Sequence, residues 1–211
     1  MTTITISRQF GAGGATLVGA GGATLGARLS KRLGYRYVND QLIKEVAKNV
    51  GVSSTRVRTI EKKGTTKLMK LLDKIVSSDS IDRQVSKKHG YIDEKRYVDE
   101  VTDIIQKLHE EGNVVIIGRG SNYALEGYGN VIHILLVADT EYRVRFLMDN
   151  YEMNRNQAEK AVKRADVIRT RFLNCFSDRE SHDDPLLYDL VLNMNRVSME
   201  QAEEIVLKRM S

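Results

Sequence analysis

The chain of 211 residues has a single cysteine and a single proline, and it has no long Ser/Gly-rich linker. A lone cysteine, Cys175, cannot form a disulfide within the chain, so we expect a partly buried thiol in a reducing cytoplasm. The length suits one hydrophobic core, alone or with a small appended lobe. Without a linker there is no candidate domain boundary, and we expect a single domain over residues 1–211.

Long hydrophobic runs and polybasic arms are also missing. No apolar stretch reaches the roughly 18 residues of a membrane-spanning helix, and no basic segment precedes an apolar one at the start, so we expect neither a membrane span nor a signal peptide. The net charge is +5, from 33 basic and 28 acidic residues. That balance suits an anionic partner. Because the two signs are interspersed, small phosphorylated ligands explain the charge at least as well as nucleic acid, which is the less favoured partner.

Glycine, by contrast, is concentrated near the N-terminus. Residues 3–7 alternate like a short buried strand, residues 27–33 have the spacing of a helix, and GAGGATLVGAGGATLG lies between them. The segment GAGGATL occurs twice, beginning at Gly11 and at Gly19. Glycines let backbone N–H groups approach phosphate oxygens, and the helix N-terminus adds a positive dipole end. The arrangement predicts a phosphate-binding loop, although such a loop needs only one copy.

This loop lacks the lysine that the Walker pattern places near a Ser or Thr. Gly14 or Gly22 stands in the lysine position, and Thr16 or Thr24 stands in the position whose hydroxyl holds Mg²⁺. Arg8, directly before the loop, is the candidate to supply the missing positive charge. The residues predicted to bind the cofactor phosphates are Arg8, Gly11, Gly13, Gly14, Thr16, Gly19, Gly21, Gly22, Ala23 and Thr24.

The second copy fits the start of the helix better than the first. If the first copy were the phosphate loop, the helix would run through Gly19, Gly21, Gly22 and Gly26. Each interior glycine costs about 1 kcal/mol relative to alanine. The alternative is that the first copy binds phosphate and the second only restarts the helix.

The rest of the chain alternates between strand-like and helix-like segments. Strands are predicted at residues 35–38, 114–117, 131–137 and 188–192. Helices are predicted at residues 41–50, 53–62, 66–76, 96–111, 141–150, 154–176 and 199–210. This alternation predicts an α/β fold with a parallel sheet covered on both faces. Ligands of such sheets bind beyond the carboxyl ends of the strands.

Arg119 is the best-placed residue at a strand end. It follows the apolar run 114–117 and lies between two glycines, where its guanidinium can fork two phosphate oxygens. The alternative is a surface arginine in a turn. His133, inside an apolar strand, reads as a core or rim residue, and His182, in a polar loop, reads as a solvated side chain. No spacing of His and Cys indicates a zinc site.

Basic residues crowd the predicted helix 154–176, among them Arg164, Arg169 and Arg171. A charged helix is usually a solvated face. An arginine-rich helix can also close as a lid over a polyphosphate, where it neutralises charge and excludes water, as phosphoryl transfer requires. Both interpretations stay open on spacing alone.

With these pieces placed, segments along nearly the whole chain resemble the cytidylate-kinase-like family within the nucleoside monophosphate kinases. They are ITISRQFGAGG from Ile4, LGYRYVNDQLI from Leu33, VVIIGRGSNYAL from Val114, VADTEYRVRFLM from Val137 and DDPLLYDLVLN from Asp183. The resemblance implies a P-loop, three-layer α/β fold with a parallel sheet. Its core would comprise residues 1–40 and 112–211, with a helical acceptor-binding insert at about 41–111 and a helical lid at about 154–184.

The resemblance also implies partners and roles. ATP, with Mg²⁺, would be the phosphoryl donor, and a nucleoside monophosphate such as CMP would be the acceptor. The GAGGAT loop would bind the ATP phosphates, and Arg119 the transferred or acceptor phosphate. Arg164, Arg169 and Arg171 would act from the lid. Asn39 and Asp40 would begin the acceptor-binding segment.

Besides the duplicated segment, the chain departs from the family pattern at three places. Glycines replace the lysine of the phosphate loop, Gly120 stands where the family carries an Asp after the Arg, and residues 55–91 do not resemble the family's acceptor domain. We expect an ATP-dependent nucleotide kinase. The alternatives are a nucleotide-binding regulatory protein that has lost catalysis, and a nucleic-acid-binding module with a steep salt dependence. The sequence carries no signal of an oligomeric state.

Overall fold

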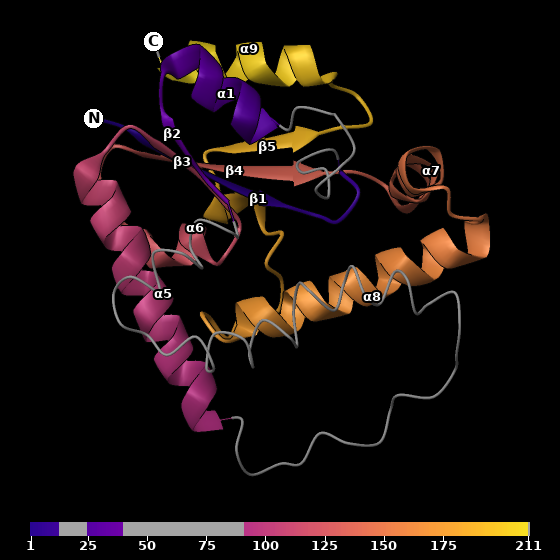
Figure 1. Ribbon diagram of the computed structural model, residues 1–211, viewed down its shortest axis with the longest axis horizontal. Helices are drawn as coiled ribbons and strands as arrows, with labels where there is room; N and C mark the ends of the chain where they lie inside the picture. The colour runs from indigo at the N-terminus through magenta and orange to yellow at the C-terminus, as the bar shows by residue number, and fades with distance from the viewer. Residues whose placement is uncertain (13–24, 40–90, 211) are drawn as a thin grey trace.

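The computed structural model describes residues 1–12, 25–39 and 91–210. These residues form a five-stranded parallel sheet with the strand order β2-β3-β1-β4-β5 (Figure 1). The strands are β1 (Thr3–Arg8), β2 (Arg36–Val38), β3 (Val114–Ile117), β4 (Val131–Val137) and β5 (Leu190–Asn193). The helices are α1 (Leu25–Leu33), α5 (Tyr91–Glu111), α6 (Ser121–Ala124), α7 (Thr140–Tyr151), α8 (Arg155–Asn174), the 3-10 helix η1 (Pro185–Leu187) and α9 (Met199–Met210).

Helices cover both faces of the sheet, with α1 and α9 on one side and α5 and α6 on the other (Figure 1). Alternate residues of β3 enter two separate apolar clusters. Val115 and Ile117 pack with α1 and α9, whereas Val114 and Ile116 pack with α5 and α6. All four side chains are buried, as expected of a strand between two layers. The predicted three-layer α/β fold is confirmed.

The chain leaves β1 and β3 toward opposite faces. From β1 it continues to α1 on one face, and from β3 it turns into α6 on the other (Figure 1). The two strands are neighbours, with Ile6 opposite Ile117. In parallel α/β sheets this divergence marks the position where ligands bind. The residues that follow β1 and β3 are therefore the leading candidates for a site.

Side-chain caps fix the starts of α7 and α8. Asp139 accepts a hydrogen bond from the backbone N of Tyr142 at 2.7 Å. Asn154 and Gln157 each accept a hydrogen bond from the other's backbone N–H. Such caps satisfy N–H groups that have no partner within the helix. Both helices therefore begin directly after their capping residues.

Gly26 lies within α1, close to the sheet. A Cβ atom at this position would lie 2.4 Å from Cδ1 of Ile117 on β3 and 3.1 Å from a ring carbon of Tyr37 on β2. Only glycine lets the helix approach the strands this closely. The helix begins at Leu25, which is the last residue of the second GAGGATL copy. The choice between the two copies stays a prediction, because residues 13–24 are outside the described part of the chain.

Other predictions also fall outside the described residues, namely the helices at residues 41–50, 53–62 and 66–76. α5, which the predicted boundaries assign to the insert, packs against the sheet through buried residues that include Val101 and Ile105. The division into core, insert and lid stays a prediction. Among the helices that the structure describes, none is both long enough and apolar enough to span a membrane.

Candidate functional site

Arg8 ends β1 at the point where β1 and β3 diverge. A Cβ atom at Gly118, the first residue after β3, would lie 3.7 Å from Nη1 of Arg8. The backbone N of Gly118 donates to the carbonyl of Ile6 at 2.9 Å, which holds the two strand ends together. The Arg8 guanidinium therefore brings positive charge to the carboxyl edge of the sheet, beside a residue without a side chain.

Residues 118–120 form a left-handed turn. The φ angles of Gly118, Arg119 and Gly120 are 64°, 62° and 69°. Glycine adopts these values without cost, but an arginine held there is strained, and such strain is concentrated at functional sites. Arg119 is only 9% exposed. A Cβ atom at Gly120 would lie 2.8 Å from the ring of Phe176, so this turn packs directly against the segment that follows α8.

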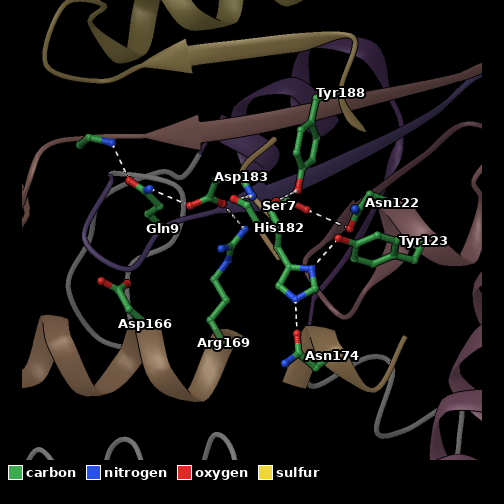
Figure 2. Close-up of polar contacts among 12 residues, drawn as sticks. Ser7, Gln9, Asn122, Tyr123, Asp166, Arg169, Asn174, His182, Asp183 and Tyr188 are labelled. Atoms are coloured by element: carbon green, nitrogen blue, oxygen red, sulfur yellow. Dashed lines mark hydrogen bonds and ion pairs between the residues drawn. The ribbon is translucent and has the colours of Figure 1, made fainter. Parts of the chain in front are cut away.

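Gln9 connects β1, β4 and the loop before η1 (Figure 2). Its Oε1 accepts from the backbone N of Ala138 at 3.0 Å, and its Nε2 donates to Oδ2 of Asp183 at 2.8 Å. The other carboxylate oxygen of Asp183 lies 2.7 Å from Nη2 of Arg169 on α8. These contacts bring the Arg169 guanidinium to the same sheet edge as Arg8.

A second arginine links the loop after β1 to α7 and α8. Arg143 of α7 is buried, and its Nε donates to the carbonyl of Phe10 at 2.6 Å. Its Nη2 donates to Oδ1 of Asp166 on α8 at 2.5 Å. Gly11 packs on the Arg143 backbone, because a Cβ atom at Gly11 would lie 3.1 Å from the Arg143 carbonyl oxygen. The first residues of the glycine-rich segment are thus fixed against α7.

His182 is not the solvated loop residue that the sequence predicts, because it is 3% exposed. Its Nδ1 lies 2.6 Å from the hydroxyl of Tyr123, and its Nε2 lies 2.6 Å from Oδ1 of Asn174 (Figure 2). The hydroxyl of Tyr188 donates to its backbone carbonyl at 2.7 Å. The His182 ring is buried between Tyr123 of α6 and Asn174 at the end of α8, which the polar composition of the loop does not reveal.

Burial and charge perturb the titrating groups of this network. Burial lowers the pKa of His182, and the positive charge of Arg169 lowers it further. Burial raises the pKa of Tyr123, and it raises the pKa of Tyr188 to about 12, against a hydrogen bond with Ser7. These shifts favour neutral His and Tyr side chains, so the positive charge at the edge comes from arginine.

The predicted site residues separate into three groups. Arg8, Arg119 and Arg169 all lie at the carboxyl edge or are connected to it, Gly11 packs against Arg143, and Asn39 follows the end of β2. Arg164 and Arg171 are exposed on α8. The predicted residues outside the described chain are Gly13, Gly14, Thr16, Gly19, Gly21, Gly22, Ala23, Thr24 and Asp40.

Two further findings concern metals and the thiol. In residues 1–12, 25–39 and 91–210, no group of three or more His, Cys, Asp or Glu side chains could hold a metal ion. The predicted magnesium ligand, the hydroxyl of Thr16 or Thr24, lies outside those ranges. Cys175 is exposed rather than partly buried, because it follows α8 on the same face as Arg171, which is also exposed.

Sequence reasoning missed several residues that build this edge. Gln9 directly follows a strand, so the rule that ligands bind at strand ends was enough to select it. Asp183 begins the quoted DDPLLYDLVLN segment, but nothing in its spacing indicates a partner on α8. The contact between Arg143 and Asp166 joins two helices and has no signal in the sequence of either.

Comparison with known proteins agrees with this architecture. An uncharacterized protein from Eubacterium ventriosum ATCC 27560 is similar over 99% of this chain and 98% of its own, with 18% identity and a TM-score of 0.67. TT1252 from Thermus thermophilus is similar over 100% of this chain and 98% of its own, with 16% identity and a TM-score of 0.51. At such identities the likeness concerns the fold.

None of the curated proteins compared with this chain matches it significantly. The model of the cytidylate kinase-like family matches residues 3–196. That range contains the whole sheet, the turn around Arg119 and all of α8. The chain therefore belongs to the cytidylate kinase-like family.

Proposed function

We propose that the protein transfers a phosphoryl group from ATP to a nucleoside monophosphate, with CMP as the first acceptor to test. The observation that carries the proposal is the position of Arg8 and Arg119 at the ends of β1 and β3, where the strands diverge, with Arg169 connected to the same edge through Asp183 and Gln9. The family match supports a nucleotide kinase in general. The acceptor and the reaction are our inference.

Phosphoryl transfer asks for little covalent chemistry from a protein. It needs the charge on the transferred group neutralised, the reacting oxygens held in line, and water excluded. Arg8 takes the place of the lysine that the glycine-rich loop lacks, and Arg119 forks the transferred or acceptor phosphate. Arg169 adds charge from α8. None of these roles requires a strong general base.

The remaining roles complete the proposal. One of the GAGGATL copies cradles the ATP phosphates, and Mg²⁺, held by the hydroxyl of Thr16 or Thr24, neutralises charge on them. Asn39 and Asp40 begin the acceptor-binding segment. Arg164 and Arg171, exposed on α8, act on phosphate from the lid. Partners are therefore small nucleotides.

The test is a coupled assay of ADP release with ATP and Mg²⁺ across a panel of nucleoside monophosphates. We expect ADP release that depends on one or a few acceptors, and little release when the acceptor is omitted. A matched reaction without Mg²⁺ serves as the control. The absence of ADP release with every monophosphate, from protein that is folded and binds ATP, would contradict the proposal.

One observation favours a second candidate, a regulatory protein that binds nucleotide without catalysis. Gly14 and Gly22 occupy the position of the loop lysine, so both copies lack a charge that P-loop enzymes use. The same assay separates the two functions. A regulatory protein binds ATP and releases no ADP, whereas a kinase does both.

A further inference from the structure

A chain of polar contacts connects Arg169 to the sheet. From the sheet outward it runs from the backbone N of Ala138 to Gln9, from Gln9 to Asp183, and from Asp183 to Arg169 (Figure 2). The lengths of the three contacts are 3.0, 2.8 and 2.7 Å. All three contacts are direct, with no intervening group between successive partners.

Gln9 is the fixed end of this chain. Its backbone N donates to the carbonyl of Leu136 on β4 at 3.0 Å, while its side-chain oxygen is held by Ala138. Its amide nitrogen therefore points in one direction, toward Oδ2 of Asp183. That bond orients the carboxylate so that its other oxygen faces α8.

The contact between Asp183 and Arg169 places the Arg169 guanidinium without forming an aligned hydrogen bond to it. Nη2 of Arg169 and Oδ1 of Asp183 are both buried, and in the described chain neither has an aligned hydrogen-bond partner. Their 2.7 Å approach is thus an ion pair of poor hydrogen-bond geometry. The Arg169 side chain keeps 19% of its surface exposed, and its guanidinium carries further N–H groups besides those of Nη2 that can donate to a phosphate oxygen.

The same helix is tied to the sheet edge one turn earlier. Asp166 lies three residues before Arg169 on α8, and it accepts from Arg143, which also holds the carbonyl of Phe10. Gln9 and Phe10 are adjacent in the chain. α8 is therefore connected twice to the same short segment, and the orientation of Arg169 is set relative to the start of the glycine-rich segment.

We propose that Asp183 is a positioning residue, held by Gln9, that aims the guanidinium of Arg169 at a phosphate bound beyond β1 and β4. The inference rests on the proposed function. It adds that the useful orientation of Arg169 is built by a carboxylate and an amide that contact no ligand themselves. If Asp183 only neutralised Arg169, removing the carboxylate would free the arginine for phosphate, and activity would rise rather than fall.

The test is a double-mutant cycle with Asp183→Asn, Arg169→Lys and the double variant, measured as kcat and KM for ATP. We expect each single variant to lose about tenfold to a hundredfold in kcat/KM, mainly in kcat, since each disturbs one charge-assisted contact to phosphate. The kcat/KM of the double variant should be no lower than that of the less active single variant, because the effects of residues that act as a unit are not additive. Gln9→Ala should give a smaller loss in the same direction.

Glu159→Gln is the matched control. Like Asp183→Asn, it replaces a carboxylate by an amide. It breaks the exposed ion pair between Glu159 and Arg155 on α8, so kcat should stay at the wild-type value. Melting temperatures of all variants show whether a loss reflects folding. Unchanged or raised kcat/KM in Asp183→Asn, or additive losses in the cycle, would overturn the positioning role while the kinase function stands.

The cycle also separates this inference from the proposed function. If the wild-type protein binds ATP but transfers no phosphate, the kinase function fails, and the same cycle is measured as the Kd for ATP. Non-additive losses in affinity then support the positioning role, and additive or absent losses overturn it. A wild-type protein that does not bind ATP overturns both.

Discussion

His182 joins three segments that are far apart in the sequence. An amide oxygen only accepts, so Nε2 of His182 must donate to Asn174, and Nδ1 of the neutral ring accepts from the hydroxyl of Tyr123. Protonation would place a charge in a buried position near Arg169. Burial and the positive charge of Arg169 therefore both lower the pKa of the ring.

This shift fixes the sign of a pH dependence. Because the pKa of His182 is lower in the folded protein than its ordinary 6.5, the unfolded chain binds more protons just below that pH, and stability falls as pH falls. We expect the unfolding free energy to drop as the pH falls through about 6.5 and below, with at most about 1.4 kcal/mol per pH unit from one group. His182→Gln should be less stable near neutral pH and show a flatter profile.

His133→Gln is the comparison variant, because burial also lowers the pKa of His133. Urea unfolding at several pH values measures all three proteins. If the unfolding free energy of His182→Gln changes with pH as steeply as that of the wild type, the His182 network is not the origin of the pH dependence.

Substitutions of Arg119 test the role of the left-handed turn after β3. An arginine held in this left-handed turn is strained, and a phosphate contact would give that strain a function. We expect Arg119→Ala to lose about tenfold to a hundredfold in kcat/KM, and Arg119→Lys to recover only part, since an ammonium cannot fork two oxygens. Arg145→Ala, which removes an exposed arginine of α7, is the control. Wild-type kinetics in Arg119→Ala would remove this residue from the site.

These two residues mark what the sequence can and cannot predict of the site. Arg119 is predictable, because a buried strand leads directly to it and the carboxyl end of that strand is where ligands bind. The burial of His182 is not, because its partners Tyr123 and Asn174 come from two other elements. From its polar composition alone, such a loop is predicted to be exposed to solvent.

At the scale of elements, α1 depends on the absence of a side chain at Gly26. Alanine would favour the helix by about 1 kcal/mol, but its Cβ atom would lie 2.4 Å from Cδ1 of Ile117, and overpacking typically costs about 1–3 kcal/mol. We expect Gly26→Ala to be destabilised, by about 1 kcal/mol in urea unfolding.

Ile117→Val removes the atom that the new Cβ would strike. The double variant of Gly26→Ala and Ile117→Val should therefore be more stable than Gly26→Ala alone. If the stability losses of the two single variants add in the double variant, the close approach of α1 to β3 is not what disfavours a side chain at position 26.

The strands and helices of the described chain were largely predictable. The apolar runs at 114–117 and 131–137 coincide with β3 and β4, because strands buried on both faces of a sheet are typically near-continuous apolar runs. The polar face of β1 was not predictable in the same way. Thr5 and Ser7 point toward hydrogen-bond partners, His133 and Asn122, that only the finished sheet brings close.

At the scale of the whole molecule, the site joins parts of the chain that are far apart. Arg8, Arg119 and Arg169 lie on three different elements and come together only when the parallel sheet is complete. A ligand that binds them binds the folded state and not the unfolded chain. Its binding must therefore appear as added stability of the whole domain.

The most direct test of the account is the unfolding free energy measured with and without ATP and Mg²⁺. At about 100 times its Kd, a ligand that binds only the folded state adds about 2.7 kcal/mol. We expect that gain with ATP or ADP, and none with equimolar adenosine, because the arginines recognise phosphate. An unchanged unfolding free energy with every nucleoside triphosphate at millimolar concentration would contradict the assignment of the carboxyl edge as a nucleotide site.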